Sequence, residues 1–205
     1  MAPTSPAPQR RIGLTGGIAT GKSSVGRLLE GRGVPVLDAD CLAQAALAPG
    51  SAGAAAVLDR YGEAVRGEGP GGIDRAALGR IVFADATERQ WLEQLVHPIV
   101  RAGLAAGLAE LATAPAVVLM VPLLFEAGLD GLCSEVWLVD CEASQQLARL
   151  IERNGLSEAE ARLRIAAQWP MERKRGLADV VINNRGRQEE LALQVEQALT
   201  RVRQP

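Results

Sequence analysis

The stretch IGLTGGIATGKSSVGRL, residues 12–28, decides how the rest of the chain is interpreted. It begins with a short apolar run, passes through a glycine-rich turn and continues with apolar residues at helical spacing. The spacing G-x-x-x-x-G-K-[ST] of a phosphate-binding loop is met by Gly16, Gly21, Lys22 and Ser23. Because strand, loop and helix signals occur together and in this order, the stretch predicts a nucleoside triphosphate site rather than a chance turn.

Each residue type in this loop has a physical use. Glycines let the backbone approach a ligand closely, so that amide N–H groups point at phosphate oxygens. The N-terminus of the following helix adds a favourable potential for anions. Lys22 is placed to reach the β- and γ-phosphates, and the Ser23 hydroxyl to ligate Mg²⁺. The predicted nucleotide-binding residues of the loop are Gly17, Ile18, Ala19, Thr20, Gly21, Lys22, Ser23 and Ser24.

The composition excludes several classes of protein. The formal net charge of −2 gives no strong field for nucleic acid. Cys41, Cys133 and Cys141 form no C-x-x-C pair and are odd in number, which favours a reducing cytosol over a disulfide scaffold. No apolar run approaches membrane-spanning length. We therefore expect a cytoplasmic protein with small-molecule substrates, and nothing in the sequence indicates an obligate protein partner.

Five short apolar runs predict the strands of a sheet. Their residues are continuously apolar rather than alternating, which is typical of parallel strands covered on both faces. The runs are Arg11–Thr15, Val34–Asp38, Ala116–Pro122, Glu135–Asp140 and Asp179–Asn183. Helical patterns separate most of them, so the fold class is α/β with a parallel sheet flanked by helices. We expect the second strand to lie beside the first, because one helix joins them.

Helix signals and composition divide the chain further. Capping-box spacing predicts helix starts at Thr87 with Gln90 and at Ser157 with Glu160, and Asn154-Gly155 predicts a helix end. A final amphipathic helix is expected over residues 188–203. Residues 1–10 are expected to form a loose tail before a single domain at 11–205. Within that domain, residues 41–112 predict a mostly helical insertion beside the phosphate loop, a natural place for a second substrate.

Acidic residues follow two of the predicted strands. Asp38 and Asp40 end the second strand run, and ligands of such sheets bind at the carboxyl ends of strands. One of the two carboxylates is suited to accept a hydroxyl proton and the other to help hold Mg²⁺, but ordinary cap or turn duty is the alternative. Glu126 lies several residues beyond the third strand, and a solvated side chain is its alternative. His97, the only histidine, has either a substrate role or a backbone hydrogen bond at a helix end.

Basic residues are concentrated between Arg149 and Arg175. Acidic residues are interspersed there, so helical ion pairs on a solvated face explain several of the arginines. A mobile lid that places one or two arginines on transferring phosphoryl groups has the same composition. We favour the lid, over residues 144–176, and expect only some of its arginines to be functional.

The ordered motifs resemble those of the dephospho-CoA kinase family, over about residues 11–197. The matching segments are Thr15–Ser23, Asp38–Asp40, Ile73–Arg75, His97-Pro98, Pro122–Glu126, Ala178-Asp179 and Ile182–Asn184. The phosphate loop alone indicates only a nucleoside triphosphate, whereas the ordered set is far more specific. Ala19-Thr20 departs from the family's more usual Gly-Ser, which costs the loop some backbone freedom.

The resemblance implies a P-loop kinase-like fold and an activity: transfer of phosphate from ATP, with Mg²⁺, to the ribose 3′-hydroxyl of dephospho-CoA, which gives coenzyme A. The implied catalytic residues are Asp40 as the base, Lys22, and Arg149 as a lid arginine near the phosphates. Asn184 is implied near the adenine. Acceptor binding is implied for Asp38, Arg75, His97 and Glu126, and metal binding for Ser23, with Asp38 or Asp40 as a further ligand.

Two other functions are compatible with the phosphate loop. One is a small-molecule kinase that acts on a nucleoside monophosphate or a similar acceptor. The other is a GTP-dependent switch or binding module, but that class requires an N-K-x-D guanine motif, and neither Lys22 nor Lys174 follows an asparagine. Residues 59–62 fit the D-x-x-G spacing of such switches without following a buried strand. The switch therefore ranks well behind.

Overall fold

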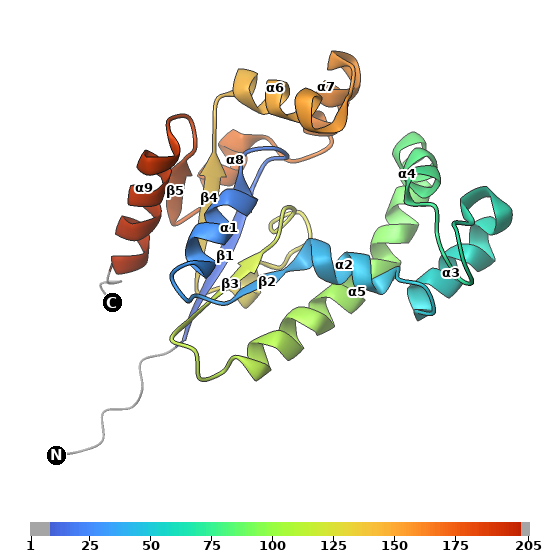
Figure 1. Cartoon of the computed structure of the whole chain (residues 1–205), viewed down its shortest axis with the longest axis horizontal. Helices are drawn as coiled ribbons and strands as arrows, with labels where there is room; N and C mark the ends of the chain where they lie inside the picture. The colour runs from blue at the N-terminus through green and yellow to red at the C-terminus, as the bar shows by residue number, and fades with distance from the viewer. Residues whose placement is uncertain (1–8, 202–205) are drawn as a thin grey trace. The chain divides into compact units, whose positions relative to one another are not determined.

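The computed structural model describes residues 9–201 (Figure 1). The chain forms two compact units. The first consists of residues up to 37 together with those from 110 onward, and the second of residues 38–109. The first unit contains the sheet, apart from Asp38 at the end of one strand, and the second is built from helices. Each unit is described by itself.

The sheet has five strands in the order β2-β3-β1-β4-β5. Their bounds are β1 Arg10–Gly16, β2 Val36–Asp38, β3 Ala116–Met120, β4 Glu135–Asp140 and β5 Val180–Asn183. The central strand β1 pairs in parallel with β3 and β4, and β4 pairs in parallel with β5. All six residues of β4 are buried, as continuous apolar runs predict for strands with both faces covered. The predicted α/β class with a parallel sheet is confirmed.

The expectation that the second strand lies beside the first is wrong. Strand β3 stands between β1 and β2, and the Val118 amide donates to the carbonyl of Pro35 (2.9 Å) just before β2 begins. A helical crossover returns the chain to the same sheet but does not require the next position in it. The apolar strand AVVLM takes the inner place, and the shorter β2 takes the edge.

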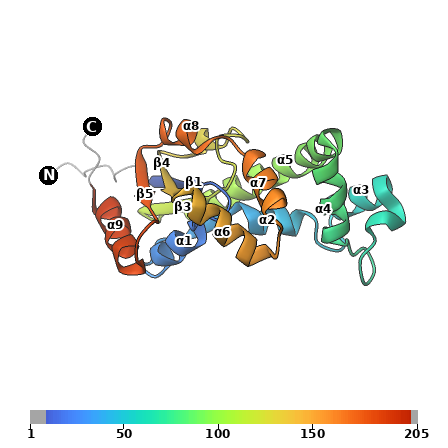
Figure 2. The ribbon, with the colours of Figure 1, turned by 90° about the horizontal axis from the view of Figure 1, so that it is seen from above.

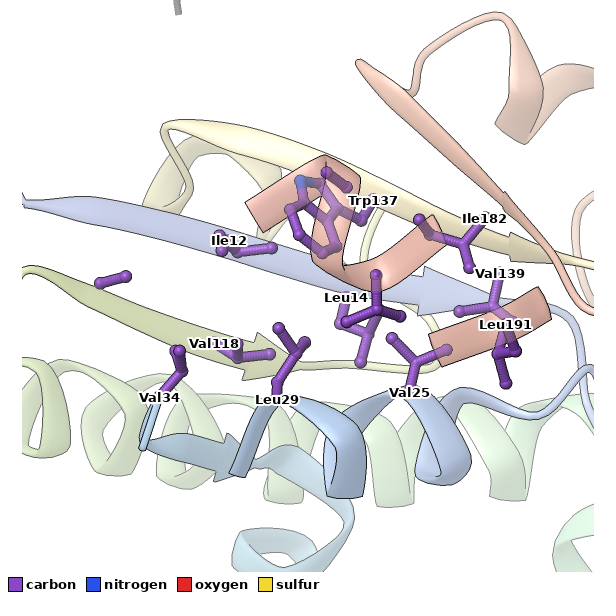
Figure 3. Close-up of a cluster of buried hydrophobic side chains, with 13 residues drawn as sticks. Ile12, Leu14, Val25, Leu29, Val34, Val118, Trp137, Val139, Ile182 and Leu191 are labelled. Atoms are coloured by element: carbon purple, nitrogen blue, oxygen red, sulfur yellow. The ribbon is translucent and has the colours of Figure 1, made fainter. Parts of the chain in front are cut away.

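The helices of the first unit cover the sheet. They are α1 Lys22–Glu30, α6 Ala143–Asn154, α7 Glu158–Ala166, α8 Met171–Arg175 and α9 Gln188–Thr200, with a 3₁₀ turn η2 at Asp130–Leu132. Helices α1 and α9 lie side by side (Figures 1 and 2). Their apolar side chains meet those of β1, β3, β4 and β5 in one cluster, which includes Leu14, Leu29 and Trp137 (Figure 3). This packing fixes β1 and α1, the two elements that flank the phosphate loop.

Helices also make up the second unit. They are α2 Ala39–Ala46, α3 Ala52–Tyr61, the 3₁₀ turn η1 Gly62–Val65, α4 Arg75–Ala84 and α5 Ala86–Glu110, whose last residue falls in the first unit. Val57, Val65, Leu78 and Val82 form its buried core. Within residues 38–109 an isolated bridge between Arg66 and Ile73 is the only strand-like pairing after β2. These residues are helical, as the Ala- and Leu-rich composition predicts.

Most of the predicted helix ends agree with the structure. The capping box of Ser157 with Glu160 is present, and α6 ends at Asn154 with Gly155 in the left-handed conformation. The start predicted at Thr87 is wrong, because α5 begins at Ala86 and the Thr87 amide donates to the Asp85 carboxylate (2.7 Å). Asp85, two residues before Thr87, caps the helix instead, and aspartate is as good an N-cap residue as threonine.

The predicted ends of the chain are tested only in part. Strand β1 already includes Arg10, so the loose tail predicted for residues 1–10 is too long by at least that residue. Residues 1–8 lie outside the described range. The final helix ends at Thr200, and Val202, which belongs to the predicted helix over 188–203, also lies outside that range.

Candidate active site

The phosphate loop joins β1 directly to α1. Gly16 ends the strand, and Gly21 precedes the helix in the left-handed conformation (φ 103°). The Lys22 ammonium turns back over the loop and donates to the carbonyls of Gly16 (3.1 Å) and Gly17 (2.8 Å). The first N–H groups of a helix lack partners within it and carry the positive end of its dipole. The loop therefore presents a lysine and helix amides for an anion, as the sequence predicts.

Ala19 is the one strained residue of the loop. Its φ is 60°, and it is the only non-glycine residue with positive φ in the part of the chain that the structure describes. An L-residue in this conformation brings its Cβ too close to the following carbonyl oxygen, at a cost of about 1–2 kcal/mol. From the sequence, Ala19-Thr20 is expected to cost the loop backbone freedom. In the structure the conformational cost falls on Ala19.

Three amide side chains from distant segments hold the loop. Asn184, after β5, donates to the Thr20 carbonyl (2.8 Å). Gln146, on α6, donates to the Ile18 carbonyl (2.9 Å), and Gln168, after α7, accepts from the Ile18 amide (2.8 Å). Asn184 was among the predicted residues, whereas the two glutamines were not. The one available signal was a polar Gln146 on the buried side of an amphipathic helix.

Arg149 lies on α6 near the same part of the loop. Its Nη2 donates to the carbonyl of Asn184 (3.1 Å), the residue whose side chain holds Thr20. Its Nη1 is buried and has no hydrogen-bond partner among residues 9–201. Burying such a donor without a partner is costly, so this N–H group is suited to donate to an anionic ligand. A role at the phosphates remains a prediction.

The two aspartates after β2 start a helix. Asp38 is the N-cap of α2, and its carboxylate accepts from the Asp40 amide (2.8 Å). Asp40 occupies the exposed first turn of that helix. The negative charge of Asp38, with hydrogen bonding and burial as smaller causes, raises the pKa of the neighbouring Cys41 thiol. Cap duty is therefore shown for Asp38, and the roles of base and metal ligand remain predictions.

Glu126 is not a solvated side chain, contrary to one of its two alternatives. Its Oε1 lies 2.7 Å from the Nζ of Lys174, which is completely buried, and it also accepts from the Trp169 amide (3.0 Å). Its Oε2 is buried without a hydrogen-bond partner in the described part of the chain. The turn after β3 is thereby tied to α8 and to the segment before it. Acceptor binding by Glu126 is untested.

The remaining predicted acceptor residues lie in the second unit. Arg75 is the first residue of α4, is exposed, and donates to the Gln44 carbonyl (3.0 Å). His97 is exposed within the long helix α5, directly before Pro98. The alternative that placed His97 at a helix end is wrong, because twelve residues of α5 follow Pro98. Exposure leaves both side chains accessible to a substrate.

The basic segment divides into structural and unassigned residues. Arg162 pairs with Glu158 one helical turn away (2.7 Å), as the ion-pair interpretation predicts. Arg175 pairs with the buried Asp140 (3.0 Å), and this hydrogen bond raises the pKa of its guanidinium. Lys174 forms an ion pair with Glu126. Among residues 9–201 no three acidic, cysteine or histidine side chains gather into a metal cluster.

The parallel sheet and the strand–loop–helix unit define a P-loop nucleotide-binding fold. A model of the dephospho-CoA kinase family matches residues 10–190. The chain therefore belongs to the dephospho-CoA kinase family. The resemblance found in the sequence is confirmed.

Individual relatives agree with this assignment. A protein named dephospho-CoA kinase from Synechococcus sp. (strain CC9605) is 64% identical over 186 residues, which are 91% of this chain and 90% of that protein. The crystal structure of TT1252 from Thermus thermophilus has a TM-score of 0.81 and 39% identity, covering 96% of this chain and all of that one. Dephospho-CoA kinase from Campylobacter jejuni (TM-score 0.69, 24% identity, covering 92% and 94%) supports the fold.

No helix within residues 9–201 combines the length and the apolar character needed to cross a bilayer.

Proposed function

We propose that this protein transfers the γ-phosphoryl group of ATP to the ribose 3′-hydroxyl of dephospho-CoA, giving coenzyme A and ADP. The observation that carries the proposal is a phosphate loop with its lysine in place, in a chain that matches the dephospho-CoA kinase family over residues 10–190. This is the last step of coenzyme A synthesis.

The protein forms no covalent bond with the substrates in this reaction. A P–O bond forms between the ribose oxygen and the γ-phosphorus, the bond to the β–γ bridging oxygen breaks, and the hydroxyl proton goes to Asp40. Lys22 exchanges its two loop carbonyls for phosphate oxygens, and Arg149 Nη1 gains an anionic partner. Positioning and electrostatic stabilisation then supply most of the rate enhancement.

The donor set also suits Mg²⁺ as the accompanying cation. Mg²⁺ prefers hard oxygen ligands, keeps several waters and is usually held by one or two protein groups plus substrate phosphates. Ser23 offers an exposed hydroxyl at the start of α1, and Asp40 an exposed carboxylate at the start of α2. When bound, the cation neutralises charge that develops between the β- and γ-phosphates. Asp38, the N-cap of α2, is the proposed acidic ligand where Asp40 acts as the base.

We assign acceptor recognition to the helical unit, where Arg75 and His97 are among the exposed polar residues. Asp38 and Glu126 are the further acceptor contacts that we propose. The lid is assigned to residues 144–176 and the adenine contact to Asn184. A cytoplasmic location is inferred from the odd number of cysteines. No obligate protein partner is proposed.

One incubation tests the proposal. The protein is incubated with ATP, Mg²⁺ and dephospho-CoA, and the product is analysed by mass and by phosphorus NMR, which distinguishes a 3′- from a 2′-phosphate. AMP, CMP and shikimate are offered in parallel as competing acceptors, and GTP as a competing donor. Formation of 3′-phosphorylated product from dephospho-CoA alone is expected. Turnover of AMP with no change in dephospho-CoA would refute the acceptor assignment.

A further inference from the structure

The Ile18 backbone in the phosphate loop is held on both sides by glutamine side chains. Gln168 Oε1 accepts from its amide (2.8 Å), and Gln146 Nε2 donates to its carbonyl (2.9 Å). We propose that Gln146 and Gln168, here called the glutamine clamp, are positioning residues that hold the loop in its nucleotide-accepting conformation. The proposal rests on the proposed function only in that the loop binds ATP.

The residue after the clamp needs such support. Ala19 has a φ of 60°, which an alanine adopts only at a cost. Strained backbone conformations persist when the surrounding structure over-determines them. The clamp fixes the carbonyl that leads into Ala19, and Asn184 fixes the carbonyl of Thr20 on its other side. Without the clamp, Ala19 is free to relax to negative φ, and the amides that follow turn away from the phosphate position.

The clamp is itself rigidly mounted. Gln146 lies on α6 and is buried. Its side-chain amide packs against Gly17, where any larger residue would clash: a Cβ at position 17 would lie 2.5 Å from Gln146 Nε2. Gln168 precedes Trp169, whose amide donates to Glu126, and Glu126 pairs with the buried Lys174. Two adjacent residues therefore contact the phosphate loop and the turn after β3, respectively. Because Gln168 is anchored through Trp169 in this way, its hydrogen bond can restrict the conformation of the loop.

The opposite role is also chemically reasonable and predicts the opposite result. The side-chain oxygen of Gln168 accepts a hydrogen bond from the Ile18 amide. If ATP required that amide as a donor, the glutamine clamp would compete with the nucleotide. Removing Gln168 would then tighten ATP binding. The positioning role is favoured because two side chains hold Ile18 directly before the strained Ala19. A competing contact predicts no effect of the residue at position 19 on the Kd of ATP.

The test combines Gln168→Met with Ala19→Gly and measures the Kd of ATP by calorimetry. Methionine keeps the length of the side chain but offers the Ile18 amide only a weakly accepting thioether in place of the amide oxygen. Loss of one hydrogen bond is expected to raise the Kd about fivefold. Ala19→Gly removes the penalty for positive φ, so in the Gln168→Met background it should recover most of that loss. Gln146→Met should behave in the same way.

Gln9→Met is the matched control. Gln9 also donates to backbone carbonyls, those of Leu111 (2.7 Å) and Ala114 (3.0 Å), and it precedes β1, at the end of that strand opposite to the loop. It should lower the melting temperature without changing the Kd of ATP, and Ala19→Gly should not rescue it. An unchanged or lower Kd in Gln168→Met, or no rescue by Ala19→Gly, would overturn the proposal. ATP binding alone is measured, so an error in the acceptor would not affect the result.

Discussion

The ion pair between Lys174 and Glu126 gives a quantitative prediction. The Lys174 side chain is completely buried, and that of Glu126 is 15% exposed. Lys174→Met keeps the aliphatic stem and removes the charge, so a carboxylate is left in the interior with Oε2 already unpartnered. Removing one member of a buried pair costs about 3–5 kcal/mol. The residual exposure of Glu126 and its bond from the Trp169 amide place the expected loss near the lower end, about 3 kcal/mol.

Thermal and urea unfolding measure this loss. For a chain of this length a destabilisation of 1 kcal/mol lowers the melting temperature by about 2–4 °C, so Lys174→Met should melt about 6–12 °C below the wild type. Glu126→Gln in the same chain removes the unpaired charge and keeps an oxygen for the Trp169 amide. The double variant should therefore return to within about 1 kcal/mol of the wild type. A single variant that loses less than about 1 kcal/mol, or a double variant no more stable than it, would refute a desolvated pair.

The double variant also decides what Glu126 does in catalysis. Stability is expected to be restored in Lys174→Met/Glu126→Gln, so a remaining kinetic defect would reflect the lost carboxylate itself. If Glu126 contacts the acceptor, the KM for dephospho-CoA rises while the KM for ATP stays constant. Equal KM values in the double variant and the wild type would remove Glu126 from the acceptor-binding residues and leave it a structural role.

Three further predictions follow from single residues. Lys22→Ala should raise the barrier by about 3–4 kcal/mol, seen as a loss of kcat, because it removes a preorganised cation from the phosphates; near wild-type kcat would show that the loop is misassigned. Asp40→Asn should lower kcat about 10²–10⁴-fold with ATP binding kept, whereas Asp38→Asn should mainly change the Mg²⁺ dependence; loss of less than about tenfold in the former would exclude Asp40 as the base. Hydrogen bonding to Arg60 lowers the pKa of Glu88 to about 2, below the 4.5 of an unperturbed glutamate. The stabilisation is then complete above the unfolded pKa and lost as the pH falls through about 2, so urea unfolding between pH 5 and pH 2 should show a smaller loss for Glu88→Gln than for the wild type.

Local signals were enough for the parts of the site that are contiguous in sequence. The phosphate loop is specified by glycines, one lysine and the apolar residues on either side, so its place between β1 and α1 followed from the sequence. Continuous apolar runs likewise identified all five strands. The order of those strands did not follow, because β3 pairs with β1 through contacts between residues about a hundred positions apart.

Side chains that act across the fold were the ones that sequence reasoning missed. Lys174 stands in a run of basic residues and looks like a solvated helix position, yet it is buried because Glu126 lies opposite. Gln146 and Gln168 carry no charge and match no motif, and only the folded chain brings them to Ile18. Such roles depend on which segments meet, which hydrophobic periodicity alone does not specify.

The conformation at Ala19 depends on residues that contact the loop from other segments. The strain at Ala19 amounts to about 1–2 kcal/mol. Each of the three amide hydrogen bonds from Gln146, Gln168 and Asn184 contributes about 1 kcal/mol, so together they are sufficient to offset it. Thr20 adds a bond from its hydroxyl to the Gly17 carbonyl (2.9 Å). Ala19 can accordingly keep a positive φ, because contacts from α6, from the segment after α7 and from the residue after β5 hold the backbone on either side of it.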